Sequence, residues 1–327
     1  MSKLKNKIAV FTSGGDSPGM NAAIRAVVRT ANHYSVDVVG IMRGYEGMID
    51  DEMIDLDANS VSGIINRGGT ILKTARSERF RTKAGMTTAF ENLKRKKISG
   101  LIAIGGDGTF RGANEFLKHC SIPTIGIPGT IDNDLFGTDF TIGYDTAINT
   151  AMDAIDKIRD TADAHNRLFF IEVMGRDAGF IAMRSGIGGG AEAILVPETK
   201  TDLEAVVDML QRGWKRKKTS NIIVVAEGDE AGGAFKIAET VKARLKQFET
   251  RVSVIGHMQR GGTPTCMDRV LASRLGVAAV EAFLEGKQNV MVGVIHKDVA
   301  YTNFDKAVKH HLDVNINLLR IAQLVSS

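Results

Sequence analysis

The sequence predicts an α/β protein with mostly parallel sheets, organised in two domains. Short apolar runs alternate with longer amphipathic segments along the chain, which is typical of strands joined by helices. Glycine-rich turns follow several of these runs, and doubly wound sheets bind their ligands at the carboxyl ends of the strands. With 327 residues, the chain is long enough to build two cores.

The composition, net charge and cysteine spacing of the chain argue against several classes of function. Charged residues make up 24% and hydrophobic residues 43% of the chain, as in ordinary globular proteins. The net charge is +4, and two basic runs, 94–97 and 215–218, lie at the ends of predicted helices, where the helix dipole favours cations. No nucleic-acid-binding module accompanies them, and no apolar run is long enough to cross a membrane. Cys120 and Cys266 show no disulfide or metal spacing, which fits a reducing compartment. Together, these observations lead us to expect a cytoplasmic protein that binds neither nucleic acid nor membranes.

The first predicted strand, 8–12, leads through a Ser-Gly-Gly turn at 13–15 into a helix. Free backbone N–H groups and the helix dipole both favour an anion at such a turn, although the motif is a loose one. On the helix, Arg25 and Arg29 are four residues apart and share the polar face.

The second predicted strand, 36–42, is followed by Tyr45 and by a polar, glycine-rich loop at 66–77. The ring of Tyr45 either lies against a purine or belongs to the rim or the core of the protein. Arg76, in the loop, is either an anion contact or a surface charge.

The next predicted strand, 99–104, is followed directly by Gly105-Gly106-Asp107-Gly108-Thr109, which opens a helix. This second strand–glycine–helix unit indicates a site for the phosphates of a nucleotide, without naming the acceptor. Asp107 could bring a Mg²⁺ ion to a polyphosphate, directly or through water.

The predicted strand 122–127 ends in Pro128-Gly129-Thr130-Ile131-Asp132-Asn133-Asp134. An Asp at a strand end can accept a proton from a substrate hydroxyl that lies within hydrogen-bond reach. The alternative is an Asx-type turn, in which the Asp and Asn side chains cap their own backbone.

The second half repeats the α/β pattern. A helix at 146–161 carries Arg159 at its polar edge, and strands are predicted at 168–173, 193–196, 221–226, 252–255 and 290–296. Polar clusters follow the strands at 174–177, 197–198, 227–228 and 256–262. They suggest that the second half of the chain binds a small anionic ligand. A lone His257 would more often be structural, but Arg260 and two glycines beside it favour a ligand site.

Four sequence blocks resemble the bacterial-type ATP-dependent 6-phosphofructokinases: 105–108 (GGDG), 128–134 (PGTIDND), 172–176 (EVMGR) and 256–262 (GHMQRGG). The resemblance extends from Thr12 to about Gly293. It implies two Rossmann-like three-layer α/β/α domains, the phosphofructokinase fold. The ATP-binding domain would comprise 1–141 and 256–305, and the fructose 6-phosphate-binding domain 142–255 and 306–327.

The resemblance also implies roles for individual residues. ATP and Mg²⁺ would bind at Gly15, Tyr45, Arg76, Ser77, Gly106, Asp107, Gly108 and Thr109, with Asp107 as the metal ligand. Asp132 would be the general base, and Thr130, Arg76 and Arg176 would lie near the transferring phosphoryl group. Fructose 6-phosphate would contact Thr130, Ile131, Asp132, Arg167, Met174, Gly175, Arg176, Glu227, Arg251, His257 and Arg260, with Arg167 and Arg251 supplied by a neighbouring subunit.

The implied function is that of a homotetrameric glycolytic kinase, which transfers the γ-phosphoryl group of ATP to the 1-hydroxyl of fructose 6-phosphate. Gly108 and Gly129 stand where pyrophosphate-using relatives carry Asp and Lys, so we expect ATP as the donor. ADP or phosphoenolpyruvate would bind as an effector at Arg25, Arg29, Arg159, Glu192 and either Arg216 or Lys218. Ala58 and Gly63 replace an Arg and an Asp of well-regulated members, so we expect weak responses to both effectors.

Two other classes of function fit the sequence less well. A dinucleotide-dependent oxidoreductase would explain the glycine-rich turns, but no Gly-x-Gly-x-x-Gly opens the first helix and Asp132 would have no role. A non-enzymatic nucleotide sensor would be expected to lose Asp132 or Arg176, and both are present.

Overall fold

The computed structural model describes residues 7–165, 167–216, 221–309 and 316–326. The chain forms two compact units, of which the first comprises Met1–Thr146 and Arg260–Leu312 and the second Ala147–Gln259 and Asp313–Ser327. The boundaries predicted after residues 141, 255 and 305 lie a few residues earlier. In the structure, the chain passes between units in the first turn of helix α5 (Tyr144–His165) and at the end of the 3₁₀ helix η2 (Gly256–Arg260).

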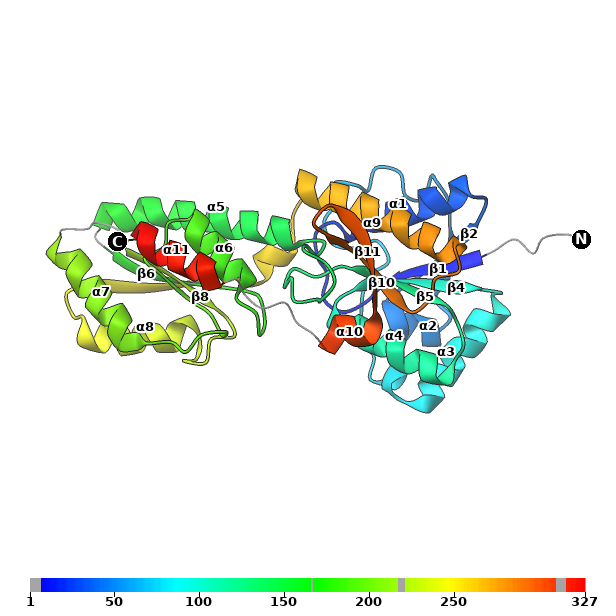
Figure 1. The fold of residues 1–327 in the computed structure, drawn as a ribbon, viewed down its shortest axis with the longest axis horizontal. Coiled ribbons are helices and arrows are strands. Elements are labelled where there is room, and N and C mark those ends of the chain that lie inside the picture. Colours follow the sequence, from blue (N-terminus) through cyan, green and yellow to red (C-terminus); the bar gives the residue numbers. More distant parts are fainter. Residues whose placement is uncertain (1–6, 166, 217–220, 310–315, 327) are drawn as a thin grey trace, which may run out of the picture. The chain divides into compact units, whose positions relative to one another are not determined.

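The first unit is built on a seven-stranded sheet with the order β11-β10-β5-β4-β1-β2-β3. Five strands are parallel: β1 (Lys7–Thr12), β2 (Asp37–Ile41), β4 (Gly100–Gly105), β5 (Thr124–Pro128) and β10 (Val290–Ile295). The edge strands β3 (Met53–Leu56) and β11 (Asp298–Asn303) are antiparallel to their neighbours. β10 comes late in the chain but lies beside β5 in this sheet (Figure 1).

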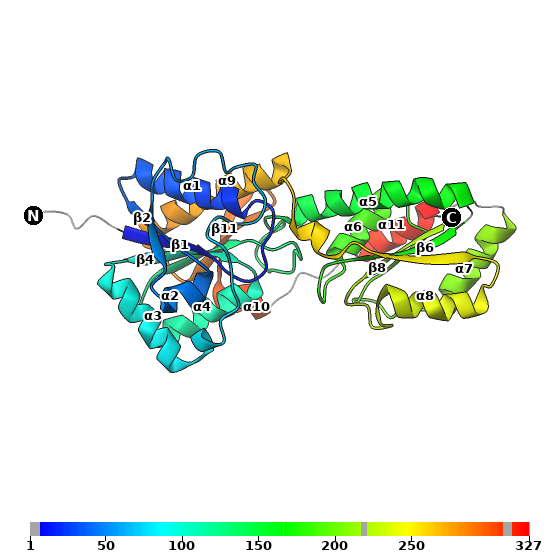
Figure 2. The same cartoon turned by 180° about the vertical axis from the view of Figure 1, so that it is seen from behind.

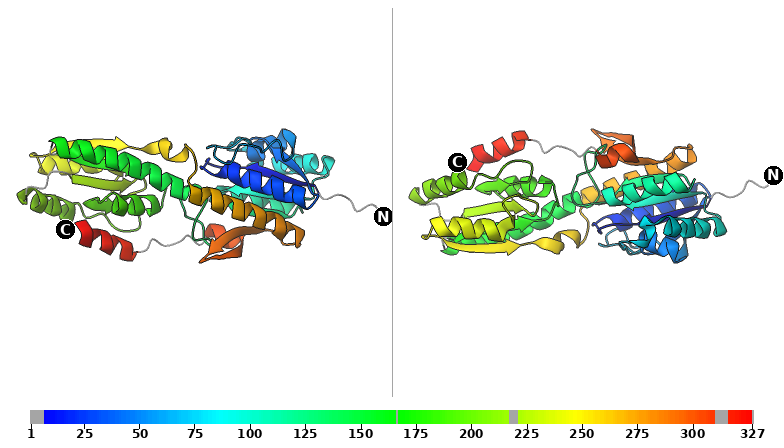
Figure 3. Two further views of the ribbon diagram at one scale, coloured as in Figure 1. Left: turned by 90° about the horizontal axis from the view of Figure 1, so that it is seen from above. Right: turned by 90° about the horizontal axis from the view of Figure 1, so that it is seen from below.

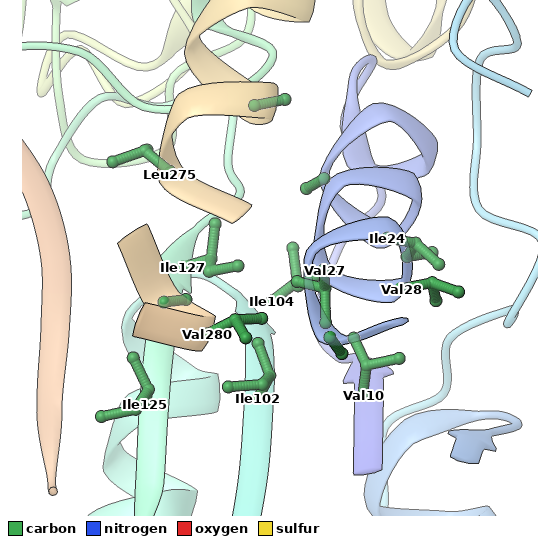
Figure 4. Close-up of a cluster of buried hydrophobic side chains, with 14 of the residues drawn as sticks. Val10, Ile24, Val27, Val28, Ile102, Ile104, Ile125, Ile127, Leu275 and Val280 are labelled. Atoms are coloured by element: carbon green, nitrogen blue, oxygen red, sulfur yellow. The ribbon is translucent and has the colours of Figure 1, made fainter. Parts of the chain in front are cut away.

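Helices cover both faces of this sheet. α1 (Met20–His33) and α9 (Cys266–Leu284) lie on one face, and α2 (Gly44–Ile49), α3 (Lys83–Arg95) and α4 (Asp107–His119) lie on the other (Figures 1 and 2). The 3₁₀ helix η1 (Arg79–Arg81) packs against α2 and α3, and α10 (Phe304–Lys309) packs against α4. On the α1 face, Figure 4 shows a core that includes Val10, Ile102, Ile104, Ile125 and Ile127 from the strands with Val27, Leu275 and Val280 from the helices. Burial on both faces explains why these strands are continuous apolar runs.

The second unit contains a four-stranded parallel sheet with the order β7-β8-β6-β9. Its strands are β6 (Arg167–Val173), β7 (Ala193–Leu195), β8 (Asn221–Ala226) and β9 (Glu249–Val254). α5, α6 (Phe180–Gly188) and α11 (Ile316–Ser326) lie on one face, and α7 (Leu203–Lys215) and α8 (Gly233–Arg244) on the other, as Figure 1 and the two views of Figure 3 show. Within the described ranges, no helix is both long enough and apolar enough to cross a membrane.

Candidate active site

Three turns leave neighbouring parallel strands of the first sheet, and hydrogen bonds connect them. The strands are β1, β4 and β5, whose carboxyl ends meet at one edge of the sheet. The backbone N–H of Ser13 donates to the carbonyl of Ile104 over 3.0 Å, and the N–H of Gly129 donates to the carbonyl of Gly105 over 3.0 Å. The hydroxyl of Thr109 donates to the carbonyl of Ser13, also over 3.0 Å. The turn after β4 is therefore fixed to the turns on both sides of it.

The turn after β4 has the geometry of a phosphate-binding turn. Its residues open helix α4, whose first backbone N–H groups and dipole favour an anion. A Cβ atom at Gly108 would meet nothing within 4 Å, so the chain leaves the space in front of this position open. A Cβ atom at Gly105, in contrast, would lie 2.2 Å from the hydroxyl oxygen of Thr109, so only glycine fits there. Asp107 is the first residue of α4, and its half-exposed neighbour Arg111 lies 3.4 Å from its carboxylate.

Arg260 lies against the turn after β1. Its guanidinium donates to the carbonyl of Asp16 over 3.2 Å, and a Cβ atom at Gly15 would lie 2.6 Å from its Nη1 atom. Arg260, which is predicted to contact the sugar phosphate, therefore packs directly on Gly15, which is predicted to contact the nucleotide. Glycine at position 15 leaves room for this arginine.

The loop that carries Arg76 is tied to the same edge of the sheet. Thr12 donates its hydroxyl to the carbonyl of Lys73 over 2.8 Å, and Thr74 donates its hydroxyl to the carbonyl of Gly14 over 2.7 Å. Arg76 follows two residues later and its side chain is exposed. The structure thus places the loop that carries Arg76 beside the turn after β1.

Two side chains that were predicted to bind the nucleotide have protein partners instead. Tyr45 is 6% exposed; its ring stacks on Phe80 with centroids 4.1 Å apart, and its hydroxyl donates to the carbonyl of Thr109 over 2.7 Å. Burial raises the pKa of Tyr45 far above its ordinary value, so the hydroxyl stays a donor. The hydroxyl of Ser77 donates to Glu46 and accepts the N–H of Phe80 over 3.1 Å. Tyr45 is thus a core tyrosine in this structure, and the one hydroxyl proton of Ser77 is used within the chain. The assignment of these two residues to the nucleotide site stays a prediction.

Asp132 is buried in the turn after β5, and a second segment holds this turn in place. Asn133 has a left-handed backbone, with φ of 53°, and its side-chain oxygen accepts the N–H of Thr141 over 2.8 Å. Its side-chain nitrogen donates to the carbonyl of Asp139 over 3.2 Å. The hydroxyl of Thr141 donates to the carbonyl of Thr130 over 2.6 Å, and Thr130 accepts the N–H of Asp132 over 3.2 Å. The side chain of Asn133 thus bonds to a separate segment and not to the backbone of its own turn, so it does not form the Asx-type turn of the alternative interpretation.

Ile131 belongs to the same turn, but its side chain is fully buried. The predicted contact of Ile131 with the sugar would therefore have to come from its backbone.

In the second unit, the carboxyl ends of β6 and β8 meet in a similar way. Glu227 follows β8, and its carboxylate accepts the backbone N–H of Gly175 over 3.2 Å and that of Arg176 over 2.7 Å. Gln259, a buried residue of η2, accepts the N–H of Met174 over 2.9 Å through its side-chain oxygen. Met174, Gly175, Arg176 and Glu227 are thus brought together as predicted, and the side chains of Arg176 and of His257, in η2, are exposed. The contact of Gln259 with Met174 was not predicted. The position of Gln259 between the predicted sugar-binding residues His257 and Arg260 could have indicated a role for it in this part of the unit.

Arg167 and Arg251 lie far from those residues within the unit. Arg167 begins β6, whereas Arg176 follows it, and both Arg167 and Arg251 donate to Glu249 at the start of β9. A strand rises about 3.3 Å per residue, so the length of β6 separates its two ends by roughly 20 Å. The unit does not bring these two arginines together with Met174, Arg176 and Glu227.

The predicted effector residues are divided between the units. Arg25 and Arg29 lie on the polar face of α1 in the first unit; Arg159, Glu192 and Arg216 belong to the second, and Lys218 lies outside the described residues. Arg159 donates to the carbonyls of Gly189 and Gly190, and Glu192 is buried. The effector site stays a prediction.

Comparison with known proteins gives a consistent assignment. The family model described as phosphofructokinase matches residues 7–283. The chain is 56% identical over 317 residues to an ATP-dependent 6-phosphofructokinase from Cytophaga hutchinsonii, which covers 97% of each chain. It is also 56% identical over 320 residues to ATP-dependent 6-phosphofructokinase 1 from Thermus thermophilus, covering 98% of this chain and 99% of the relative.

The fold resembles a solved structure of phosphofructokinase from Saccharomyces cerevisiae, with a TM-score of 0.87 and 36% identity. That match covers 93% of this chain and 45% of the yeast chain, so this chain spans about half the length of its yeast relative. The agreement of the family match, the bacterial relatives and the fold shows that the chain belongs to the phosphofructokinase family.

Proposed function

We propose that this protein is an ATP-dependent 6-phosphofructokinase, which transfers the γ-phosphoryl group of ATP to the 1-hydroxyl of fructose 6-phosphate. The observation that carries the proposal is the edge of the first sheet. At that edge, the turns after β1 and β4 are glycine turns suited to phosphate, and the turn after the adjacent parallel strand β5 carries the buried Asp132. The names of the bacterial relatives support the same donor and acceptor.

The residues suit the requirements of phosphoryl transfer. The reaction needs the attacking oxygen and the leaving oxygen in line through phosphorus, with the charge on the equatorial oxygens neutralised. Asp132 would accept the proton of the sugar hydroxyl as the new bond forms. Backbone N–H groups at the start of α4 would hold the phosphates, and the guanidinium groups of Arg76 and Arg176 would neutralise the developing charge.

Asp107 suits a Mg²⁺ site that the nucleotide completes. Among the described residues, no cluster of three or more His, Cys, Asp or Glu side chains is arranged to hold a metal ion. Mg²⁺ is commonly bound by one or two carboxylates together with substrate phosphates and water, and Asp107 at the phosphate turn fits that pattern. When bound, the ion would neutralise charge on the donor phosphates.

We also propose that the second unit binds fructose 6-phosphate and that the enzyme works as a homotetramer. Glu227 orders the backbone of Gly175 and Arg176, and the exposed Arg176 and His257 suit an anionic sugar. Arg167 and Arg251 lie near the other end of β6, which supports their assignment to the site of a neighbouring subunit. The cytoplasmic location stays a prediction.

For regulation, we propose a weak response to ADP and to phosphoenolpyruvate. A Cβ atom at Gly63 would meet nothing within 4 Å, so the space that the Asp side chain of regulated members would enter is open here. A lost charge-assisted hydrogen bond is worth about 1.5–3 kcal/mol, as much as a typical allosteric coupling. Initial velocity against fructose 6-phosphate, with and without each effector at millimolar level, should show little change in half-saturation. A large shift would contradict the proposal.

Turnover assays with alternative donors test the proposed reaction. The purified protein, with Mg²⁺ and fructose 6-phosphate, should release ADP from ATP and should not use pyrophosphate; omission of the sugar is the control. The open space at Gly108 would admit the nucleotide, and a Cβ atom at Gly129 would lie 3.0 Å from Ile104, which leaves little room for the lysine of pyrophosphate-using relatives. Turnover with pyrophosphate and none with ATP would contradict the proposal.

A further inference from the structure

Helix α2 holds the segment that follows Arg76 through a carboxylate. Glu46 accepts the hydroxyl of Ser77 and the Nε–H of Arg79, the latter over 2.7 Å. Arg79 also donates to Asp50 over 2.5 Å, and the pKa of Asp50 is lowered chiefly by this contact, so Asp50 stays charged. The side chain of Glu46 is only 19% exposed. Glu46 therefore binds the chain at two points directly after Arg76.

The neighbouring residue of α2, Tyr45, holds the same segment from the core side. Its ring stacks on Phe80 with an interplanar angle of 20° and packs against α4, where a Cβ atom at Gly112 would lie 2.9 Å from it. Its hydroxyl donates to the carbonyl of Thr109, in the first turn of α4. Tyr45 thus contacts both the Arg76 segment and the helix that opens with the phosphate turn.

We propose that Tyr45 and Glu46 are positioning residues, which hold Arg76 at a fixed place relative to the phosphate turn of α4. This inference rests on the proposed function, because it takes Arg76 and the turn at 106–108 as parts of the site for the phosphoryl donor. The hydroxyl of Tyr45 and the carboxylate of Glu46 are both engaged within the chain, so these two polar groups act through the residues that they hold. Their effect is preorganisation, since a segment that is already ordered loses less entropy when the ligand binds.

Binding and kinetics of two conservative variants test the proposal. Glu46→Gln removes the charge that attracts Arg79, and Tyr45→Phe removes the hydrogen bond to Thr109 while keeping the ring stack. We expect each to weaken the binding of ADP with Mg²⁺, measured by calorimetry, and to raise KM for ATP, by roughly three- to tenfold for partly exposed or single contacts of this kind. KM for fructose 6-phosphate should change little. Glu115→Gln breaks an exposed pair with Lys118 and should leave all three quantities unchanged.

A double-mutant cycle with Arg76→Ala shows whether the two residues act through Arg76. If they do, Glu46→Gln should weaken ADP binding in the wild-type background and have little further effect in the Arg76→Ala background, because contacts in one network are not additive. Equal effects in both backgrounds, or no effect in either, would overturn the proposal. Arg79→Lys keeps a cation beside Glu46, so its affinity for ADP should be closer to that of the wild type than the affinity of Arg79→Ala. A wild-type protein that neither binds ADP nor uses ATP would contradict the proposed function itself, so the two failures can be told apart.

Discussion

At the scale of single residues, the buried turn after β5 depends on Asn133 and Thr141, which do not react. The left-handed backbone at Asn133 is uncommon for a residue with a side chain, and the amide of Asn133 makes it tenable by bonding across to residues 139 and 141. Thr141 is 1% exposed and bonds both Asn133 and the carbonyl of Thr130. The position of Asp132 is therefore set from a segment several residues further along the chain.

Replacing Thr141 by an isosteric residue tests this support. Thr141→Val keeps the shape of the side chain but leaves the buried carbonyl of Thr130 without its hydroxyl donor. A buried group that loses its partner costs about 1–3 kcal/mol of unfolding free energy, which urea denaturation measures. We expect kcat to fall by about tenfold, since small displacements of a reacting group are costly, with KM for ATP changed less. Thr141→Ser keeps the hydroxyl, so its kcat and its free energy of unfolding should be closer to those of the wild type. A Thr141→Val variant with wild-type kcat and stability would refute the supporting role of Thr141.

The residue types in the turns predicted that Asp107 and Asp132 follow buried strands, and the structure has both at the carboxyl ends of such strands. Their roles in a reaction stay predictions. The partners of the Tyr45 and Ser77 side chains could not be predicted, for a physical reason. Their partners, Phe80 and Glu46, lie more than thirty residues away from them in the chain. A sequence pattern gives the place of a residue in a turn, but not the direction in which its side chain points.

At the scale of elements, a buried carboxylate joins helix α9 to the start of α5. Asp268 accepts the backbone N–H groups of Gly143 and Thr146, each over 2.8 Å, and the hydroxyl of Thr146 over 2.5 Å. Thr265 caps α9 by accepting the N–H of Asp268 and donates its own hydroxyl to Asp145 over 2.6 Å. The connection fixes α9 to the chain that follows Thr141.

The pH dependence of stability reports on Asp268. Burial raises its pKa above the ordinary value of 3.8, against the effect of its three hydrogen bonds. The folded state therefore holds the proton at pH values where the unfolded state has lost it, so the contribution of Asp268 to stability should fall as pH rises from about 3.8 through the folded pKa. Urea unfolding of wild type and Asp268→Asn over that range should show wild type losing stability relative to the variant. If the wild type instead gained stability relative to the variant as pH rises, the hydrogen bonds would have a larger effect on the pKa of Asp268 than burial has, and the prediction would be wrong.

Continuous apolar runs predicted the central strands within one to three residues, because those strands are covered on both faces. Neither edge strand of the first sheet, β3 nor β11, was predicted, since both are partly exposed and lack such a run. The place of β10 beside β5 also does not follow from local pattern, because pairing between distant strands is set by the packing of the whole unit.

At the scale of the whole molecule, Arg251 lies near the start of β6, whereas Arg176 follows the end of that strand. If both arginines bind fructose 6-phosphate, as predicted, each site must be completed by the Arg251 of a second subunit. Inactive Asp132→Asn chains mixed with inactive Arg251→Ala chains should recover activity after subunit exchange, because some hybrid sites then carry neither defect. A mixture of Asp132→Asn with Arg76→Ala is the matched control: both defects belong to the first unit and should leave every site impaired. A fully active monomer, or hybrids without recovered activity after verified exchange, would contradict the shared site.

The most direct test of the central claim is kcat of the Asp132→Asn variant with ATP, Mg²⁺ and fructose 6-phosphate. Asn keeps the size of the buried side chain but cannot accept the proton of the sugar hydroxyl. We predict that kcat falls by about 10²–10⁴-fold, the usual contribution of a general base. KM for fructose 6-phosphate and the affinity for ADP should stay within a few-fold of wild type. A variant whose kcat also stays within a few-fold of wild type would contradict the assignment of Asp132 as the base and the reaction built on it.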